Sequence, residues 1–499
     1  MAAGLSLFEL VGTLAVAYTA WTVSTWIYNV YFHPLAKFPG PRMAAMTAHW
    51  KMWRYLVAKD HIPKMFEVHA QYGNIVRLHF SDPDAYNEIY HPSRRWLKDE
   101  RLYGSLVNGM STWNFLDYSS AKKRREILLS HFSRKSIIEL QHLVQDRMDI
   151  LCDAISRQYE AGKSSDFYHA FKCFSLDTIT SVCFAKPVNA TDAPDFKAPI
   201  VMAMDESLNT LQVFVFFKLA RTLAAYMPSS LLVVMNKALQ GYVDFRNVLS
   251  KQIKEILADP SMLSSAPHPI IYHSLLDYKD KNAAATNMGF DDLNEEAFVL
   301  VFAGSDTTSN TATTGVIHAI ENRRVYNALK EELMTAWPVL EERPRYEQLE
   351  KLPYLTAVVK ESLRMSHGIV TPPIRVVPYE GTTISGRAIP AGTVVGMSAC
   401  MVHWSESVFP NARTFQPERW LGSAAKELDT YLVAFSKGPR ACVGINLGYC
   451  ELYLAIANIF RRFDMELDGV STADLTWIDF YIPLHTGPDM RVFAKPVSS

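Results

Sequence analysis

Residues 435–444 read FSKGPRACVG, and this stretch decides how the whole chain is interpreted. Glycines lie on both sides of Cys442, and a helix-like run over residues 446–463 starts just after it. A thiol in this position can receive backbone N–H groups and the positive end of a helix dipole, which stabilise a thiolate. Glycine has no Cβ, so the backbone can approach a large flat ligand. The stretch therefore predicts that Cys442 is a metal ligand and that Arg440 offers its guanidinium to a carboxylate of the bound group.

The other cysteines have an ordinary interpretation. The chain of 499 residues holds six cysteines and no C-x-x-C pair, so a disulfide framework, a zinc site and dithiol chemistry are poorly supported. A reducing compartment is the simpler reading of this composition. Burial as small apolar side chains is expected for the remaining five, which are Cys152, Cys173, Cys183, Cys400 and Cys450.

The cysteine stretch resembles the haem-binding signature of the cytochromes P-450, F-x-x-G-x-R-x-C-x-G, at every fixed position. Three further segments, 303–308, 361–364 and 417–420, match that family in the expected order, so the resemblance covers essentially the whole chain. It implies a mainly α fold with small β-sheets and a haem b whose iron is bound by Cys442. It also implies haem contacts from other residues of the stretch, which are Phe435, Arg440 and Gly444.

Residues 303–308 read AGSDTT inside a stretch with helical periodicity. Small residues followed by an acid and two hydroxyls allow a helix to open locally, because threonine can take over a backbone hydrogen bond. The resemblance implies that Thr307 is the hydroxyl of oxygen activation and that Asp306 is the acid that relays protons. Read alone, the segment is equally compatible with an ordinary helix turn capped by an Asp-Thr pair.

Glu361 and Arg364 lie three residues apart on one predicted helix face. Without further context they form a surface ion pair of small energetic consequence. The resemblance instead implies a buried group completed by Arg419 from a later meander. We therefore expect these three residues to hold the cysteine loop and to take no part in catalysis.

Two more arginines are expected to bind the haem propionates. Residues 117–133 resemble the helix that runs beside the haem, with Arg125 as one contact, and Arg375 is another. The family usually carries Trp or His four residues before that first arginine, but here the position is Ala121. Lys122 is the candidate for the missing contact.

Electrons must come from a partner, because no G-x-G-x-x-G segment and no space for a reductase domain exist beside a complete haem domain. The resemblance implies an NADPH-cytochrome P-450 reductase. A basic cluster could form its docking face or could simply be solvated, and consists of Lys122, Lys123, Arg124 and Lys437. The formal net charge of −1 gives no reason to expect nucleic acid as a partner.

The N-terminal segment predicts a membrane anchor. Residues 10–32 contain no charged side chain and are long enough, as a helix, to cross a hydrocarbon core of ~30 Å. Positive charge follows this span, which places the catalytic domain in the cytosol and favours a single-pass protein of the endoplasmic reticulum membrane. A cleaved signal peptide is disfavoured because no basic region precedes the span. The predicted organisation is an anchor (1–32), a proline-rich hinge (33–42) and a haem-thiolate monooxygenase domain (43–499).

Periodicity predicts helices over 134–160, 242–257, 294–320 and 323–337. Short β-rich patches lie near 75–80, 374–377, 382–395 and 475–494. Residues 405–435 read as an ordered meander. The apolar segment 211–219 is expected to be a buried helix, with membrane contact or a substrate entrance as the alternatives.

The chain is similar to fungal cytochromes P-450 of secondary metabolism, of the trichodiene oxygenase type. This similarity implies hydroxylation or epoxidation of a hydrophobic small molecule, a terpenoid or a polyketide, with membrane lipid as the surroundings. Two alternatives stay open: a haem-thiolate isomerase or dehydratase without external electrons, and a non-catalytic haem-binding membrane protein. Candidate pocket residues, equally compatible with core packing, are Val301, Phe302, Ala303, Ile369, Val370, Thr371 and Ile482.

Overall fold

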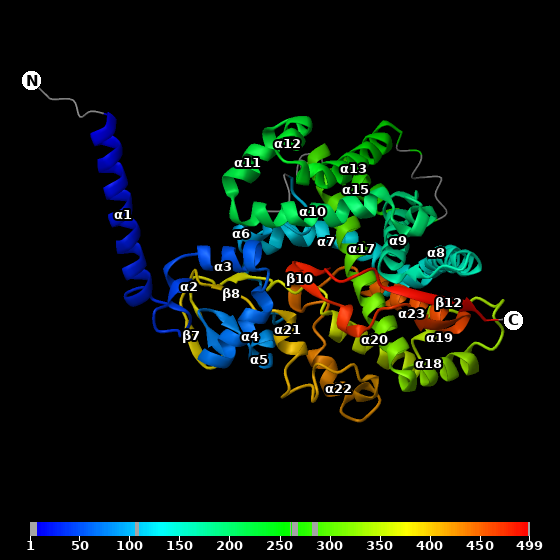
Figure 1. Ribbon diagram of the computed structural model, residues 1–499. Helices are drawn as coiled ribbons and strands as arrows, with labels where there is room; N and C mark the ends of the chain where they lie inside the picture. The colour runs from blue at the N-terminus through cyan, green and yellow to red at the C-terminus, as the bar shows by residue number, and fades with distance from the viewer. Residues whose placement is uncertain (1–6, 105–108, 260, 262–267, 282–287, 498–499) are drawn as a thin grey trace, which may run out of the picture.

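The computed structural model describes residues 7–104, 109–259, 261, 268–281 and 288–497. Helices make up most of this part of the chain, and the strands are short (Figure 1). The longer α-helices are α1 (Leu7–Tyr31), α4 (His61–Tyr72), α7 (Tyr118–His131), α8 (Arg134–Glu160), α9 (Phe167–Phe184), α10 (Pro199–Phe216), α11 (Lys218–Tyr226), α13 (Gln240–Ala258), α15 (Ile271–Lys281), α17 (Phe290–Glu321), α18 (Arg323–Ala336), α20 (Pro353–Ser366) and α23 (Ile445–Arg462). The shorter ones are α2 (Arg42–Met46), α3 (His49–Trp53), α5 (Pro83–Ile89), α6 (Glu100–Tyr103), α12 (Ser229–Met235), α19 (Tyr346–Leu349), α21 (Ala399–His403) and α22 (Ala425–Leu428).

The strands form five small antiparallel sheets within the described residues. They are β1 (Ile75–Val76) with β2 (His79–Phe80), β6 (Thr382–Ile384) with β7 (Arg387–Ile389), and β10 (Trp477–Phe480) with β11 (Ile482–His485). One three-stranded sheet has the order β3 (Leu97–Lys98), β5 (Arg375–Val376), β8 (Val394–Val395). The other has the order β4 (Ser165–Asp166), β12 (Arg491–Pro496), β9 (Phe463–Leu467). In the sheet of β3, β5 and β8, Lys98 pairs with Arg375, so two cations lie side by side.

The core of the fold lies around α17, which packs against α9, α13, α20 and α23. All residues of α9 are buried, including its polar side chains, among them Lys172 and Asp177. The two helices approach closely at Gly304, where a Cβ would lie 2.8 Å from Cγ1 of Ile179. Glycine is therefore required at this position by packing.

The predicted elements are largely confirmed. The helices expected at 134–160, 242–257, 294–320 and 323–337 are α8, α13, α17 and α18, and the expected β-rich patches contain strands. Strands β3, β4 and β9 lie outside the predicted patches; β3 and β4 have only two residues each, which are too few to carry a period, and β9 follows directly on α23. The meander contains only short helical turns, among them Pro417–Trp420.

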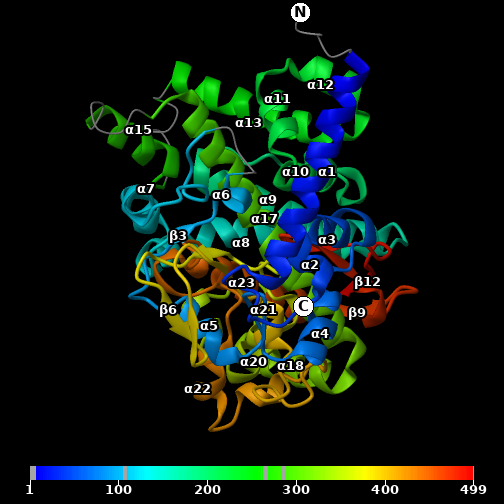
Figure 2. The same ribbon diagram turned by 90° about the vertical axis from the view of Figure 1, so that its left-hand side faces the viewer.

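Helix α1 stands apart from the globular body (Figures 1 and 2). Its residues Phe8–Tyr31 have a mean hydropathy of 1.3 and none of them is buried, and within the described residues this is the one helix whose length and composition suit a membrane span. The apolar segment 211–219 is not a single buried helix, because Phe217 breaks it between α10 and α11. Phe214 is buried, whereas Phe217 and Leu219 are exposed.

Candidate functional site

The loop that carries Cys442 is fixed by its own backbone. The N–H of Cys442 donates to the carbonyl of Phe435 at 2.9 Å, which closes the loop. Gly438 has φ +73°, and a Cβ there would collide with the carbonyl oxygen of Tyr90. Helix α23 begins at Ile445, directly after Gly444. The sulfur is thereby held just before a helix N-terminus, as the sequence predicted.

The Cys442 side chain is accessible although it lies deep in the protein. Burial raises the pKa of its thiol, and the opposing effects of the Gly444 N–H and of Arg125 are smaller. An accessible group surrounded by dense protein is what the wall of an internal cavity presents. Desolvation opposes the thiolate that the sequence predicted, whereas the Gly444 N–H and Arg125 favour it. A bound metal ion would have to displace the proton.

Four cationic side chains converge near the loop from four different elements: Lys98 from β3, Arg125 from α7, Arg375 from β5 and Arg440 from the loop itself. Their neighbouring charges are felt: burial, Arg375, Arg440 and Arg125 together lower the pKa of Lys98 well below its usual range. Burial, Arg375 and Arg125 lower the pKa of Arg440 to about 10. None of the four is in an ion pair within the described part of the chain.

The hydrogen bonds of this cation cluster are made to neutral oxygens. Arg125 donates to the carbonyl of Ala441 at 2.8 Å, and Arg375 donates to the hydroxyl of Tyr103 at 2.8 Å. Arg440 donates one Nη2 bond to the carbonyl of Asp117 at 2.6 Å, but its buried Nε and Nη1 have no partner among the described residues. Several cations that lie close together, with N–H donors left without a partner, form a site that suits a ligand with two negative charges.

Lys98 is a member of this cluster that the sequence analysis missed, because a single lysine in a two-residue strand carries no pattern. Lys122, the candidate for the missing contact, is exposed and lies 3.6 Å from Glu126 on the same helix. Ala121 is completely buried. In the structure Lys98, and not Lys122, lies with the arginines near the loop.

The basic docking cluster is also smaller than the sequence suggested. Arg124 is buried and forms an ion pair with Glu296 at 2.9 Å, so it is not available to a partner protein. Lys437 is half-buried and donates to Oδ1 of Asn87 at 2.6 Å. Lys122 and Lys123 remain exposed.

Helix α17 is continuous through residues 303–308. The Thr307 hydroxyl donates to the carbonyl of Ala303 at 2.8 Å, which is the threonine bond that the sequence predicted, without local opening of the helix. Ala303 is exposed although it lies in the middle of a mostly buried helix, so it too borders internal space. Asp306 is buried and forms an ion pair with Lys172 of α9. Burial raises the pKa of Asp306 to about 6, although the Lys172 ammonium acts in the opposite direction.

Glu361, Arg364 and Arg419 meet in the structure as expected. Arg364 binds Glu361 with Nε at 2.9 Å and Nη2 at 2.8 Å, and Arg419 Nε lies 3.2 Å from the same carboxylate. The remaining Arg364 donors bind the carbonyls of His403, Ala412 and Thr414. The group thus joins α20 to the meander that precedes the cysteine loop.

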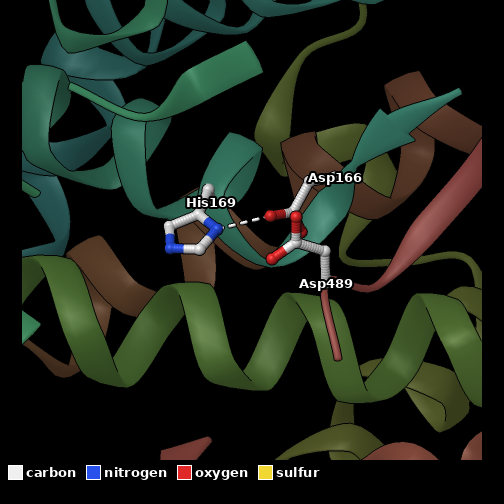
Figure 3. A group of neighbouring side chains, drawn as sticks. All are labelled: Asp166, His169 and Asp489. Carbon is white, nitrogen blue, oxygen red and sulfur yellow. Dashed lines mark hydrogen bonds and ion pairs between the residues drawn. The ribbon is translucent and has the colours of Figure 1, made fainter. Parts of the chain in front are cut away.

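A second cluster of possible metal ligands lies away from the cysteine loop, where Asp166, His169 and Asp489 have ligand atoms within 4.8 Å of one another (Figure 3). Both ring nitrogens of His169 face carboxylates, Nδ1 facing Asp166 and Nε2 facing Asp205 at 3.8 Å. Bonds to these two acids outweigh burial and raise the pKa of His169 to about 9. In the structure these residues, together with Asp205, form a network of ion pairs.

The cytochrome P450 family model matches residues 41–477, a region that contains the cysteine loop, α17 and α20. The cytochrome P450 monooxygenase flvC of Aspergillus flavus is 30% identical, over 94% of this chain and 93% of that protein. The cytochrome P450 monooxygenase macH of Penicillium terrestre is 32% identical, over 93% of this chain and 94% of that protein. The tryptophan 6-hydroxylase fscE of Fusarium equiseti is 30% identical, over 96% and 95% of the two chains.

Proposed function

The chain belongs to the cytochrome P450 family and is a haem-dependent monooxygenase, and from this premise we propose the roles of its residues and its substrate class. Cys442 is the iron ligand, and Thr307 with Asp306 serves oxygen activation. The substrate is a hydrophobic terpenoid or polyketide of a fungal secondary pathway. The observation that carries this proposal is an accessible thiol deep in the fold beside four cations that have no acidic partner among the described residues.

The residues fit a haem. The unused donors of Arg440 suit a propionate, and Arg125, Arg375 and Lys98 supply the remaining charge for two propionates. The Phe435 ring lies 5.2 Å from that of Tyr449, centroid to centroid, in a tilted arrangement, which gives an apolar wall beside the loop. When bound, a haem would supply oxygen activation, with electron density from the Cys442 thiolate. Binding of two propionates would also relieve the mutual repulsion of the four cations.

Residues 303–308, which we call the oxygen segment, supply the side chains that take part in the reaction. Thr307 lies one residue after the buried acid Asp306, and the accessible Ala303 lies one helical turn before it. The Thr307 hydroxyl would orient a proton for oxygen activation, and the apolar surroundings would limit entry of water. Oxygen activation needs an acid–hydroxyl pair, and an isomerase that uses no external electrons does not. The presence of this pair therefore favours oxygenation.

The electrons for this reaction come from a redox partner, for which we propose an NADPH-dependent diflavin reductase in the same membrane. Helix α1 anchors the enzyme in the endoplasmic reticulum membrane with the catalytic domain in the cytosol. Helices α11 and α12 lie on the same side of the body as the N-terminal end of α1 (Figures 1 and 2). They expose apolar side chains, among them Leu219, Tyr226 and Val234, which suits a second contact with lipid.

The proposal is tested with membranes that contain this protein and a diflavin reductase. NADPH is supplied with sesquiterpene, diterpene and reduced polyketide scaffolds, and with tryptophan because one relative is named a tryptophan 6-hydroxylase. Mass gains of oxygen are recorded. We expect oxygenated products from one scaffold class, lost without NADPH and strongly reduced in Thr307→Ala. A product that forms without NADPH, or Thr307→Ala with full activity, would contradict the proposed chemistry.

A further inference from the structure

Asp306 is one end of a buried network of ions that leads away from the oxygen segment. Its carboxylate binds the ammonium of Lys172, which is completely buried on α9. The same ammonium binds Asp205 of α10, so one lysine joins acids from two other helices. The second oxygen of Asp306, Oδ2, has no partner among the described residues.

The network reaches solvent at Asp205, which is the second residue from Asp306 along the network. The side chain of Asp205 is 20% exposed and that of His169 is 11% exposed, and their charged atoms lie 3.8 Å apart. The other ring nitrogen of His169 binds Asp166, which anchors the imidazole at the surface end (Figure 3). A continuous file of ionisable groups thus runs from the surface to the acid that precedes Thr307.

The charges of the file single out Asp306 as the group that takes up a proton. Three carboxylates (Asp166, Asp205 and Asp306) face two cations (His169 and Lys172). Asp489 lies within 4.8 Å of Asp166 and His169 but is paired with Lys197, so that pair adds no net charge. With all of them ionised the file has one negative charge in excess, and burial makes such an excess unfavourable. Asp306 is buried, is bonded to a single cation and has a second oxygen without a partner among the described residues, so a proton on that oxygen restores neutrality without breaking a bond.

We propose that Lys172 is a positioning residue for oxygen activation and that Asp205 and His169 with it form the route by which solvent protons reach Asp306. This inference rests on the proposed role of Asp306 and Thr307. A proton from water binds Asp205, while Lys172 gives one proton to Asp306 and takes one from Asp205. The charge of Lys172 is the same before and after, and the net change is one O–H bond formed at Asp306.

The experiment measures proton access to Asp306 directly in the haem-loaded ferric enzyme in detergent. Infrared difference spectra between the wild type and Asp306→Asn identify the carboxylic C=O band of Asp306 near pH 6. Transfer into D₂O shifts this band, and the rate of the shift reports how fast solvent protons arrive. Asp205→Asn keeps the ion pair between Lys172 and Asp306 and removes the step to the surface. We expect it to slow the exchange at least tenfold.

Two lysine variants complete the test. Lys172→Met should slow the exchange by a similar factor and move the pH at which the band disappears upward by a unit or more, whereas Lys172→Arg should restore both. Lys360→Met is the matched control, because it removes an ion pair with Asp429 (2.7 Å) outside the file and should change neither quantity. Exchange at the wild-type rate in Asp205→Asn would overturn the route even if Lys172→Met does not fold.

Failure of the route can be distinguished from failure of the proposed function. The substrate that the scaffold panel identifies is supplied with NADPH and the reductase. The ratio of oxygenated product to NADPH consumed is then measured for Asp306→Asn and Asp205→Asn. A normal ratio in Asp306→Asn would refute the role of Asp306 itself. A low ratio in Asp306→Asn with a normal ratio in Asp205→Asn would refute only the route.

Discussion

Neutralising Glu361 by Glu361→Gln should destabilise the folded protein by about 3–5 kcal/mol, because it leaves buried guanidinium charge without a carboxylate. Five hydrogen bonds converge on this carboxylate, from Arg364 (two), Arg419, the Gln416 N–H and the Trp420 indole. Arg364 and Glu361 are both completely buried, so water cannot replace the lost partner. The meander that precedes the cysteine loop should loosen first, since Arg364 binds its carbonyls.

The assay is urea unfolding of the haem-loaded protein, followed both by tryptophan fluorescence and by the haem-thiolate spectrum. At a urea slope of about 3 kcal/mol per molar, the midpoint should fall by about 1 M or more. Asp429→Asn is the matched control: it breaks an ion pair with Lys360 (2.7 Å) that joins the same helix to the same meander at the surface. That change should cost about 0–1 kcal/mol. Equal midpoints for the two variants would refute the assignment of a buried structural role to Glu361.

Three further outcomes follow from the structure. Lys98→Met should weaken retention of haem and yet stabilise the haem-free protein, because one of four mutually repelling cations is removed; unfolding of both forms in urea checks the opposite signs. The pKa of His169, raised to about 9, gives stability that is fully present below pH 6.5 and is lost as pH rises through 9, an effect of about 3 kcal/mol. His169→Gln should flatten this dependence in urea midpoints taken at pH 6.5 and 9, and an unchanged slope would contradict it. Removal of residues 1–32 should move much of the protein from the membrane to the soluble fraction on ultracentrifugation, with a detergent-sensitive remainder held by α11 and α12; a deletion that stays fully bound would contradict the role of α1.

Local sequence was sufficient for much of the fold. The helices α8 and α18 begin and end within a residue of the predicted positions, because their apolar residues recur with the helical period over many turns. Two-residue strands such as β3 carry no such signal, so their existence depends on the partner strand that tertiary folding brings to them.

The candidate site divides in the same way. The residues within the cysteine stretch, and Thr307 on α17, were found from short segments in which glycines, an arginine and hydroxyls have fixed spacing. Arg124 and Lys122 were misjudged, because a basic run gives no information on which side chain faces the core. Burial of one and exposure of the other are set by the helices that pack on α7.

By itself, the sequence determined that this chain is mainly helical, has an apolar N-terminal span and carries a cysteine stretch of the haem-thiolate type, since these features depend on residues close together along the chain. Only the tertiary structure decided that Lys98 joins the arginines around the loop and that Lys172 lies between Asp205 and Asp306. These contacts connect residues that are distant in sequence. Burial selects the contacts of Lys172, because charges that cannot reach water must find partners from whichever element packs beside them. Lys98 is placed beside Arg375 by the pairing of β3 with β5.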